Sequence, residues 1–227
     1  MHIYITGSTG RNGKLTLQAA LANNHTVTAL VRNPSSLTPH PNLTIVQGTP
    51  TSQADVQRAL TTPQLPQAII STLSLRRTSD SPFAALSPDS PADFLESTME
   101  TLIAAVKSTF PASKLPKIIV NSSMGAGSSE PAMSMPIRFI FKHTAMRFTL
   151  QGHNNMDEIV RQSGLTFVLA RAARLVDGQE AGDLEALSDD GKGCGWNPTT
   201  NRGALGRWMV EAAETDTWDG KSPVLID

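Results

Sequence analysis

Short apolar runs alternate with longer segments of helical periodicity along most of the chain. Runs rich in Val, Ile, Leu and Thr predict strands, and apolar residues spaced three and four apart predict amphipathic helices. We expect strands at residues 3–6, 26–31, 43–47, 68–73, 117–121, 166–170 and 223–226. We expect helices at residues 14–21, 54–60, 94–110, 137–148, 153–165 and 202–214. This alternation is typical of an α/β domain with a mostly parallel sheet covered by helices on both faces, and we predict a single domain over 1–227.

The first expected strand runs into three glycines spaced three residues apart. Glycines let the backbone turn tightly, approach a phosphate closely and bring the next helix against the sheet. The free N–H groups and the positive dipole end of that helix favour a pyrophosphate. The predicted contacts are Gly7, Ser8, Thr9, Gly10, Arg11, Asn12 and Gly13. The alternative is a strand-to-helix turn with a structural role only.

Arg32 follows the second expected strand, 19 residues after Gly13. In a dinucleotide-binding fold the residue at this place faces the adenosine ribose. An acidic residue would accept hydrogen bonds from the 2′-hydroxyl, whereas a guanidinium matches a 2′-phosphate and keeps its charge. We therefore predict NADP(H) rather than NAD(H) as the cofactor, with Arg11 as a second phosphate ligand. The alternative is that Arg32 is a solvated residue at a strand end.

Composition narrows the partners and the compartment. The chain of 227 residues has a net charge of −1 and scattered basic residues, which argues against nucleic acid or an anionic membrane as a partner. No apolar run approaches the roughly 18 residues of a spanning helix, and the first residues show no secretory signal. A single cysteine, Cys194, allows no internal disulfide and no cysteine-rich metal site. We expect a cytoplasmic monomer or homodimer without bound metal that acts on a small molecule.

Three segments are expected to border the site, because ligands of such folds sit outside the carboxyl ends of the strands. They are residues 74–93, 125–150 and 178–201. The first is rich in Ser and Pro and carries Arg76 and Arg77, which either clamp an anionic group or are solvated. The end of the fourth strand contributes Ser71, Thr72 and Leu73, as backbone contacts to the inner ribose or as strand packing.

The sequence Thr6-Gly-Ser-Thr-Gly-Arg-Asn-Gly13 resembles the Thr-Gly-x-x-Gly-x-x-Gly signature of extended and atypical short-chain dehydrogenase/reductases. It is most similar to the atypical NAD(P)-binding group of NmrA-like proteins, quinone reductases and flavin/biliverdin-IXβ reductases. The resemblance implies a Rossmann-like, doubly wound fold. It also implies that Ser123, with Ser122 beside it, points from the fifth strand toward the nicotinamide and the substrate.

The catalytic tyrosine and lysine of most such reductases are absent. Tyr4 is the only tyrosine and lies in the first strand. Counting back from Ser163-Gly164-Leu165, the family spacing puts the tyrosine position on Thr149 and the lysine position on His153. The flavin/biliverdin-IXβ reductases also lack the tyrosine and carry a histidine there, which implies catalytic roles for Ser123 and His153. With a usual pKa of about 6.5, His153 is expected to reach both protonation states, or else it only packs.

An apolar stripe within residues 133–151 contains methionine and aromatic side chains that would suit a planar apolar substrate. A core-facing helix or a dimer contact would explain the stripe as well. The basic residues on its other flank are expected to be solvated, namely Arg138, Lys142, His143 and Arg147.

These features favour an NADPH-dependent oxidoreductase that transfers hydride to a flavin, quinone or enone, since such acceptors delocalise the added electron pair. Two alternatives remain open. One is an NmrA-like protein that senses NAD(P) without turnover. The other is a non-redox isomerase, cyclase or lyase on the same fold.

Overall fold

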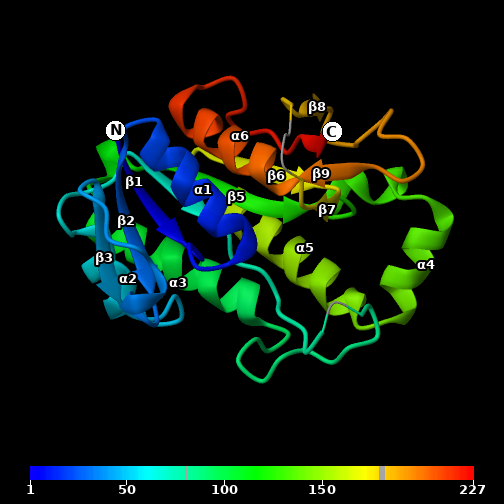
Figure 1. The fold of residues 1–227 in the computed structure, drawn as a ribbon, viewed down its shortest axis with the longest axis horizontal. Helices are drawn as coiled ribbons and strands as arrows, with labels where there is room; N and C mark the ends of the chain where they lie inside the picture. The colour runs from blue at the N-terminus through cyan, green and yellow to red at the C-terminus, as the bar shows by residue number, and fades with distance from the viewer. Residues whose placement is uncertain (80, 179–181) are drawn as a thin grey trace.

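The computed structural model describes residues 1–79, 81–178 and 182–227, and its main feature is one twisted sheet (Figure 1). The strand order is β3-β2-β1-β4-β5-β6-β10-β8, and β8 alone among these strands is antiparallel to its neighbour. The strands are β1 (His2–Thr6), β2 (Thr26–Val31), β3 (Leu43–Gln47), β4 (Ala68–Ser71), β5 (Lys117–Ser123), β6 (Phe167–Ala172), β8 (Glu185–Leu187) and β10 (Val224–Ile226). β7 (Arg174–Val176) and β9 (Thr199–Asn201) form a second, two-stranded parallel sheet.

Helices cover both faces of the large sheet (Figure 1). The helices are α1 (Arg11–Ala22), α2 (Gln53–Leu60), α3 (Phe94–Thr109), α4 (Met135–His143), α5 (Met146–Gln162) and α6 (Arg202–Glu214), and α4 packs against α5 beyond the sheet (Figure 1). α1 and α6 pack together on one face, and α2, α3 and α5 lie on the other. The mostly parallel sheet and its helices confirm the predicted Rossmann-like fold.

The alternation of side chains along β1 separates the two halves of the core. Ile3 and Ile5 point into the apolar cluster under α1 and α6, whereas Tyr4 points into the cluster under α2, α3 and α5. Tyr4 is fully buried there, and burial raises the pKa of its hydroxyl above the ordinary value. Its position in the core agrees with the expectation that Tyr4 takes no part in chemistry.

The segment 125–150 differs from the expectation of one helix at 137–148. It contains a 3-10 turn at Gly127–Ala132, then α4 and the start of α5, so the expected helix is broken in two. Thr144 is extended, with φ −125° and ψ −178°, and its hydroxyl oxygen accepts a hydrogen bond from Met146 N at 3.1 Å. α4 therefore ends at Thr144 and α5 begins after it, because a threonine hydroxyl can bond a nearby backbone N–H in place of the helical hydrogen bond.

In the parts of the chain that the structure describes, the helices lack the combination of length and apolar character that crossing a membrane requires.

Candidate cofactor and substrate site

A cleft of about 380 Å³ opens at the carboxyl ends of β1, β2, β3 and β4. Its walls are the glycine turn after β1, the end of β2, residues 49–51 after β3 and residues 72–74 after β4. Loop residues 76, 89–91 and 93 and the first turn of α3 complete the lining. Dinucleotides bind at this edge of a doubly wound sheet, so the cleft is the candidate cofactor site.

The glycine turn has the geometry that a pyrophosphate needs. Gly7 has φ +82°, and a Cβ on Gly13 would lie 2.1 Å from the carbonyl oxygen of Gly7. α1 begins behind Gly10, whose position as N-cap leaves the first turn without a side-chain cap. The buried hydroxyls of Thr6 and Ser8 have no hydrogen-bond partner among the described residues. Open backbone donors at a helix N-terminus and a cradle that a Cβ would fill fit an NAD(P) pyrophosphate.

The cleft brings together part of the predicted cofactor set, which is Gly7, Thr9, Gly10, Arg32, Thr72 and Leu73. Other predicted residues of the turn lie outside its lining. Arg11 pairs with Asp177, and Asn12 Oδ1 accepts a hydrogen bond from Arg202 Nη1 at 2.6 Å. Ser8 is fully buried, and Gly13 packs against Gly7.

The end of β4 divides its three predicted residues. Ser71 is buried within the sheet and pairs with Thr6 of β1. Thr72 reaches the cleft, and its hydroxyl donates to the carbonyl of Thr6 at 3.0 Å. Leu73 also lines the cleft. Thr72 therefore ties the ends of β1 and β4 together beside the glycine turn.

Arg32 is exposed to solvent and forms an ion pair at the rim of the cleft. Its Nη1 lies 3.0 Å from Asp89 Oδ2, and the guanidinium of Arg76 pairs with the same oxygen. Ser87 Oγ donates to the other carboxylate oxygen at 2.8 Å. Sequence reasoning identified the two arginines as candidates but missed Asp89, because nothing local links residue 89 to the end of β2.

A second cavity of about 790 Å³ lies between α4 and α5. Its apolar wall includes Met133, Phe141 and Leu150. The four basic residues expected to be solvated line it as well, namely Arg138, Lys142, His143 and Arg147. Glu130 is the acidic residue on its wall and pairs with Arg138 at 3.1 Å. The cavity therefore offers flat apolar surface together with an excess of positive charge.

The inner wall of this second cavity touches the loop that leaves β5. A Cβ on Gly125 would lie 2.6 Å from Met133 Sδ, and Gly127 N donates to Asn154 Oδ1 at 2.7 Å. Ser123 precedes this loop, is half-buried, and donates from Oγ to the carbonyl of Met124 at 3.0 Å. The loop after β5 thus adjoins the second cavity, whereas Ser123 itself lies outside the linings of the two cavities.

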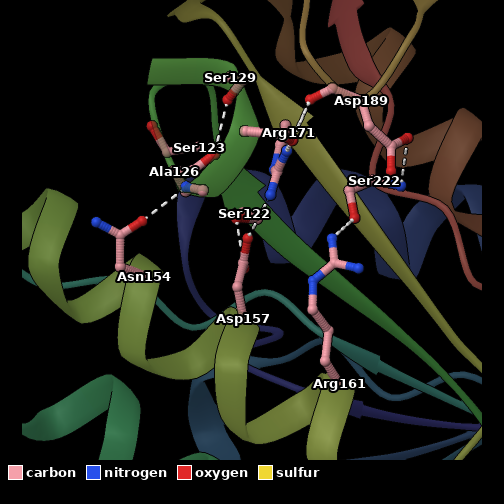
Figure 2. Close-up of polar contacts among 12 residues, drawn as sticks. Ser122, Ser123, Ala126, Ser129, Asn154, Asp157, Arg161, Arg171, Asp189 and Ser222 are labelled. Carbon is pink, nitrogen blue, oxygen red and sulfur yellow. Dashed lines mark hydrogen bonds and ion pairs between the residues drawn. The ribbon is translucent and has the colours of Figure 1, made fainter. Parts of the chain in front are cut away.

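Ser122 takes part in a buried polar network behind this loop (Figure 2). Its Oγ donates to Asp157 Oδ1 at 2.8 Å, and Asp157 Oδ2 lies 3.2 Å from Arg171 Nη2. Arg171 Nη1 also donates to Ser128 Oγ at 2.9 Å and to the carbonyl of Asp189 at 2.8 Å. Burial raises the pKa of Asp157, while Arg171 and Ser122 act in the opposite direction. The network fixes the ends of β5 and β6, and the side chain of Ser122 is directed into it.

The structure corrects the expectation that His153 reaches both protonation states near neutral pH. Its side chain is buried in α5, and burial lowers its pKa to about 4. Its Nδ1 has no hydrogen-bond partner within the described residues. His153 also lies outside the linings of the two cavities. The histidine is therefore neutral at physiological pH.

Within the described residues there is no group of three or more His, Cys, Asp or Glu side chains that could hold a metal ion. Cys194 is buried, and burial raises the pKa of its thiol.

The fold and the cleft together define an NAD(P)-binding α/β protein. A family model described as NAD(P)H-binding matches residues 7–216, and the chain belongs to this family. A search of curated protein sequences finds no match.

Solved structures of the same fold cover the whole chain. An anaerobilin reductase from Escherichia coli is 19% identical with a TM-score of 0.76, and the alignment covers 100% of this chain and 97% of that one. A short-chain dehydrogenase/reductase from Veillonella parvula in complex with NADP is 17% identical with a TM-score of 0.74, covering 100% and 94%. A putative NADH-flavin reductase from Streptococcus pneumoniae is 15% identical with a TM-score of 0.70, covering 100% and 99%. These neighbours confirm the predicted resemblance to atypical short-chain and flavin reductase-like proteins at the level of the fold.

Proposed function

We propose that the protein is an NADPH-dependent oxidoreductase that reduces a planar, conjugated small molecule carrying an acidic group. The observation that carries this proposal is the pair of cavities at the carboxyl edge of the sheet. One has the glycine turn of a dinucleotide site, and the other adjoins the loop that follows β5. The reductase names of structures with the same fold support the reaction class.

The cofactor assignment rests on the charge at the adenosine end of the cleft. Arg32 and Arg76 both line it and share Asp89 as an ion-pair partner, while Asp93 is the other acidic residue of the lining. Paired guanidinium groups bind phosphate in a bidentate fashion, whereas a ribose hydroxyl needs an acceptor. NADPH, when bound, supplies a hydride that its nicotinamide delivers.

In this proposal the residues of the chain position the substrate and do not protonate it. Tyr4 lies in the core, and His153 is neutral and buried. Hydride addition to a conjugated acceptor leaves a delocalised anion, so water entering the open second cavity is a sufficient proton source. We assign Ser123, at the carboxyl end of β5, the role of a positioning residue for the substrate.

The substrate class follows from the lining of the second cavity. The apolar side chains of Met133, Phe141 and Leu150 offer contact area for a flat ring system. Lys142 has no ion-pair partner in the described part of the chain, and Arg147 lies over Phe148 at 4.7 Å. Cations in the lining of an apolar cavity favour a ring that bears a carboxylate or a phosphate.

The test is a cofactor-consumption screen with quinones, flavins and conjugated carbonyls, run beside an NADPH binding titration. We expect NADPH oxidation with at least one acceptor class. Tight binding without consumption would instead establish the sensor alternative. Product formation without nicotinamide would establish the non-redox alternative.

FMN and riboflavin provide a matched pair for the acidic group, because they share the ring system and differ in a phosphate. We expect a lower KM for FMN, and Lys142→Gln should raise the FMN value by about two- to fivefold and leave riboflavin unchanged. Lys107→Gln, which removes an exposed lysine of α3, is the control. Equal KM values for the two flavins would remove the acidic group from the proposal.

A further inference from the structure

Asp89 lies between the two arginines of the nucleotide cleft, and all three residues line it. We propose that this carboxylate occupies the place of the cofactor's 2′-phosphate in the nucleotide-free protein and thereby sets the selectivity between NADP(H) and NAD(H). Arg76 then becomes a second 2′-phosphate ligand beside Arg32. The inference rests on the NADPH assignment made above and adds the residue that opposes it.

The contacts of Asp89 are those of a small anion in an anion site. A single oxygen, Oδ2, faces both guanidinium groups, which come from the end of β2 and from the loop after β4. A phosphate monoester carries a charge of about −1.5 to −2 and three acceptor oxygens, against one charge and two oxygens for a carboxylate. A 2′-phosphate therefore displaces Asp89, whereas the 2′-hydroxyl of NAD(H) leaves the carboxylate in place.

Backbone hydrogen bonds hold the loop that carries Asp89 in place, independently of the ion pairs that its side chain makes with the two guanidinium groups. Ser87 N donates to the carbonyl of Arg76 at 2.8 Å, and Arg76 N donates to Ser90 Oγ at 2.9 Å. Ser90 is buried, while the Asp89 side chain is 42% exposed. The backbone near residue 89 is thus held in place, and the exchange of anions requires only side-chain rotation.

Competition between Asp89 and the 2′-phosphate lowers the affinity for the cofactor by an amount that the exposure of the two ion pairs limits. Each arginine–carboxylate pair here is exposed, with side-chain exposures of 61% for Arg32 and 53% for Arg76. Exposed pairs contribute little individually. Two of them together are expected to reduce 2′-phosphate affinity by about three- to tenfold.

The experiment compares 2′,5′-ADP with 5′-AMP by calorimetric titration, since only the first carries the 2′-phosphate. Asp89→Asn should tighten 2′,5′-ADP by about three- to tenfold and leave 5′-AMP within about twofold. Asp89→Ala, which removes the acceptor as well as the charge, should do the same. Asp93→Asn is the matched control, because it removes one negative charge from the same cleft without touching the arginine pair.

Several outcomes would overturn the inference. One is an unchanged ratio of the two affinities in the Asp89 variants, and another is an equal gain with Asp93→Asn. Weaker binding of 5′-AMP in Asp89→Asn would instead make the carboxylate a ribose ligand. These titrations measure binding without turnover, so their result does not depend on the outcome of the acceptor screen. If the unmodified protein bound 2′,5′-ADP no better than 5′-AMP, the NADPH assignment itself would be wrong.

Discussion

The acid sensitivity of folding is expected to depend on His153. The folded protein holds its pKa at about 4, whereas an unfolded chain restores the ordinary value near 6.5. Between these pH values the unfolded state binds more protons than the folded state, so the free energy of unfolding falls as pH drops through this window. Above about pH 6.5 the effect vanishes, because the histidine is neutral in both states. The difference in pKa corresponds to about 3 kcal/mol lost by pH 4.

Urea unfolding of the unmodified protein and of His153→Gln, at about pH 7 and about pH 4.5, measures this loss. The stability difference between the two proteins should change by about 2 to 3 kcal/mol between these conditions in favour of the variant. Any packing cost of glutamine appears equally at both pH values and cancels. His153→Leu provides a second variant without a titrating group.

His40→Gln is the control, since it removes an exposed histidine. It should show the same pH dependence as the unmodified protein. If His153→Gln lost as much stability on acidification as the unmodified protein, the histidine would not be held neutral. The pH profile of turnover is likewise expected to show no ionisation of His153.

Two further substitutions test the glycine turn and the buried ion pair. Gly13→Ala should abolish nucleotide binding in a titration, because its Cβ would lie 2.1 Å from Gly7 O; Gly10→Ala, whose closest contact is 3.3 Å, should be milder. Equal loss from both substitutions would contradict the close-approach argument. Asp157→Asn should lower the free energy of unfolding by about 3 to 5 kcal/mol in thermal or urea unfolding, because Arg171 keeps a buried charge without its counter-charge. Adding Arg171→Met should recover part of that loss, and strict additivity would count against a coupled pair.

The sequence predicts the strands that build the nucleotide cleft well. The bounds of β2 and β3 agree with expectation, and so do those of α6. These elements have apolar runs or stripes long enough to identify them, and both ends carry turn signals. In contrast, β7, β8 and β9 have three residues each and were not expected. Their pairing depends on partners such as β10, which lies far away in the sequence.

The candidate site was predictable where one motif carries it and not where distant segments meet. The glycine turn lies within a single stretch, so its place in the cleft could be foreseen. The Asp89 contact joins residues that are 57 positions apart, and no local pattern encodes it. The neutral state of His153 could not be foreseen either, because desolvation depends on what packs around α5.

The two cavities are lined by residues from separate segments of the chain. Residues 6–97 line the nucleotide cleft, and residues 130–155 line the cavity between α4 and α5. The border within α5 falls before Asp157, so the buried network belongs to the scaffold. The lining of the second cavity thus comes from one contiguous segment of 26 residues. Under the proposed function, replacing this segment with that of another member of the NAD(P)H-binding family should change the acceptor and leave nucleotide binding unchanged.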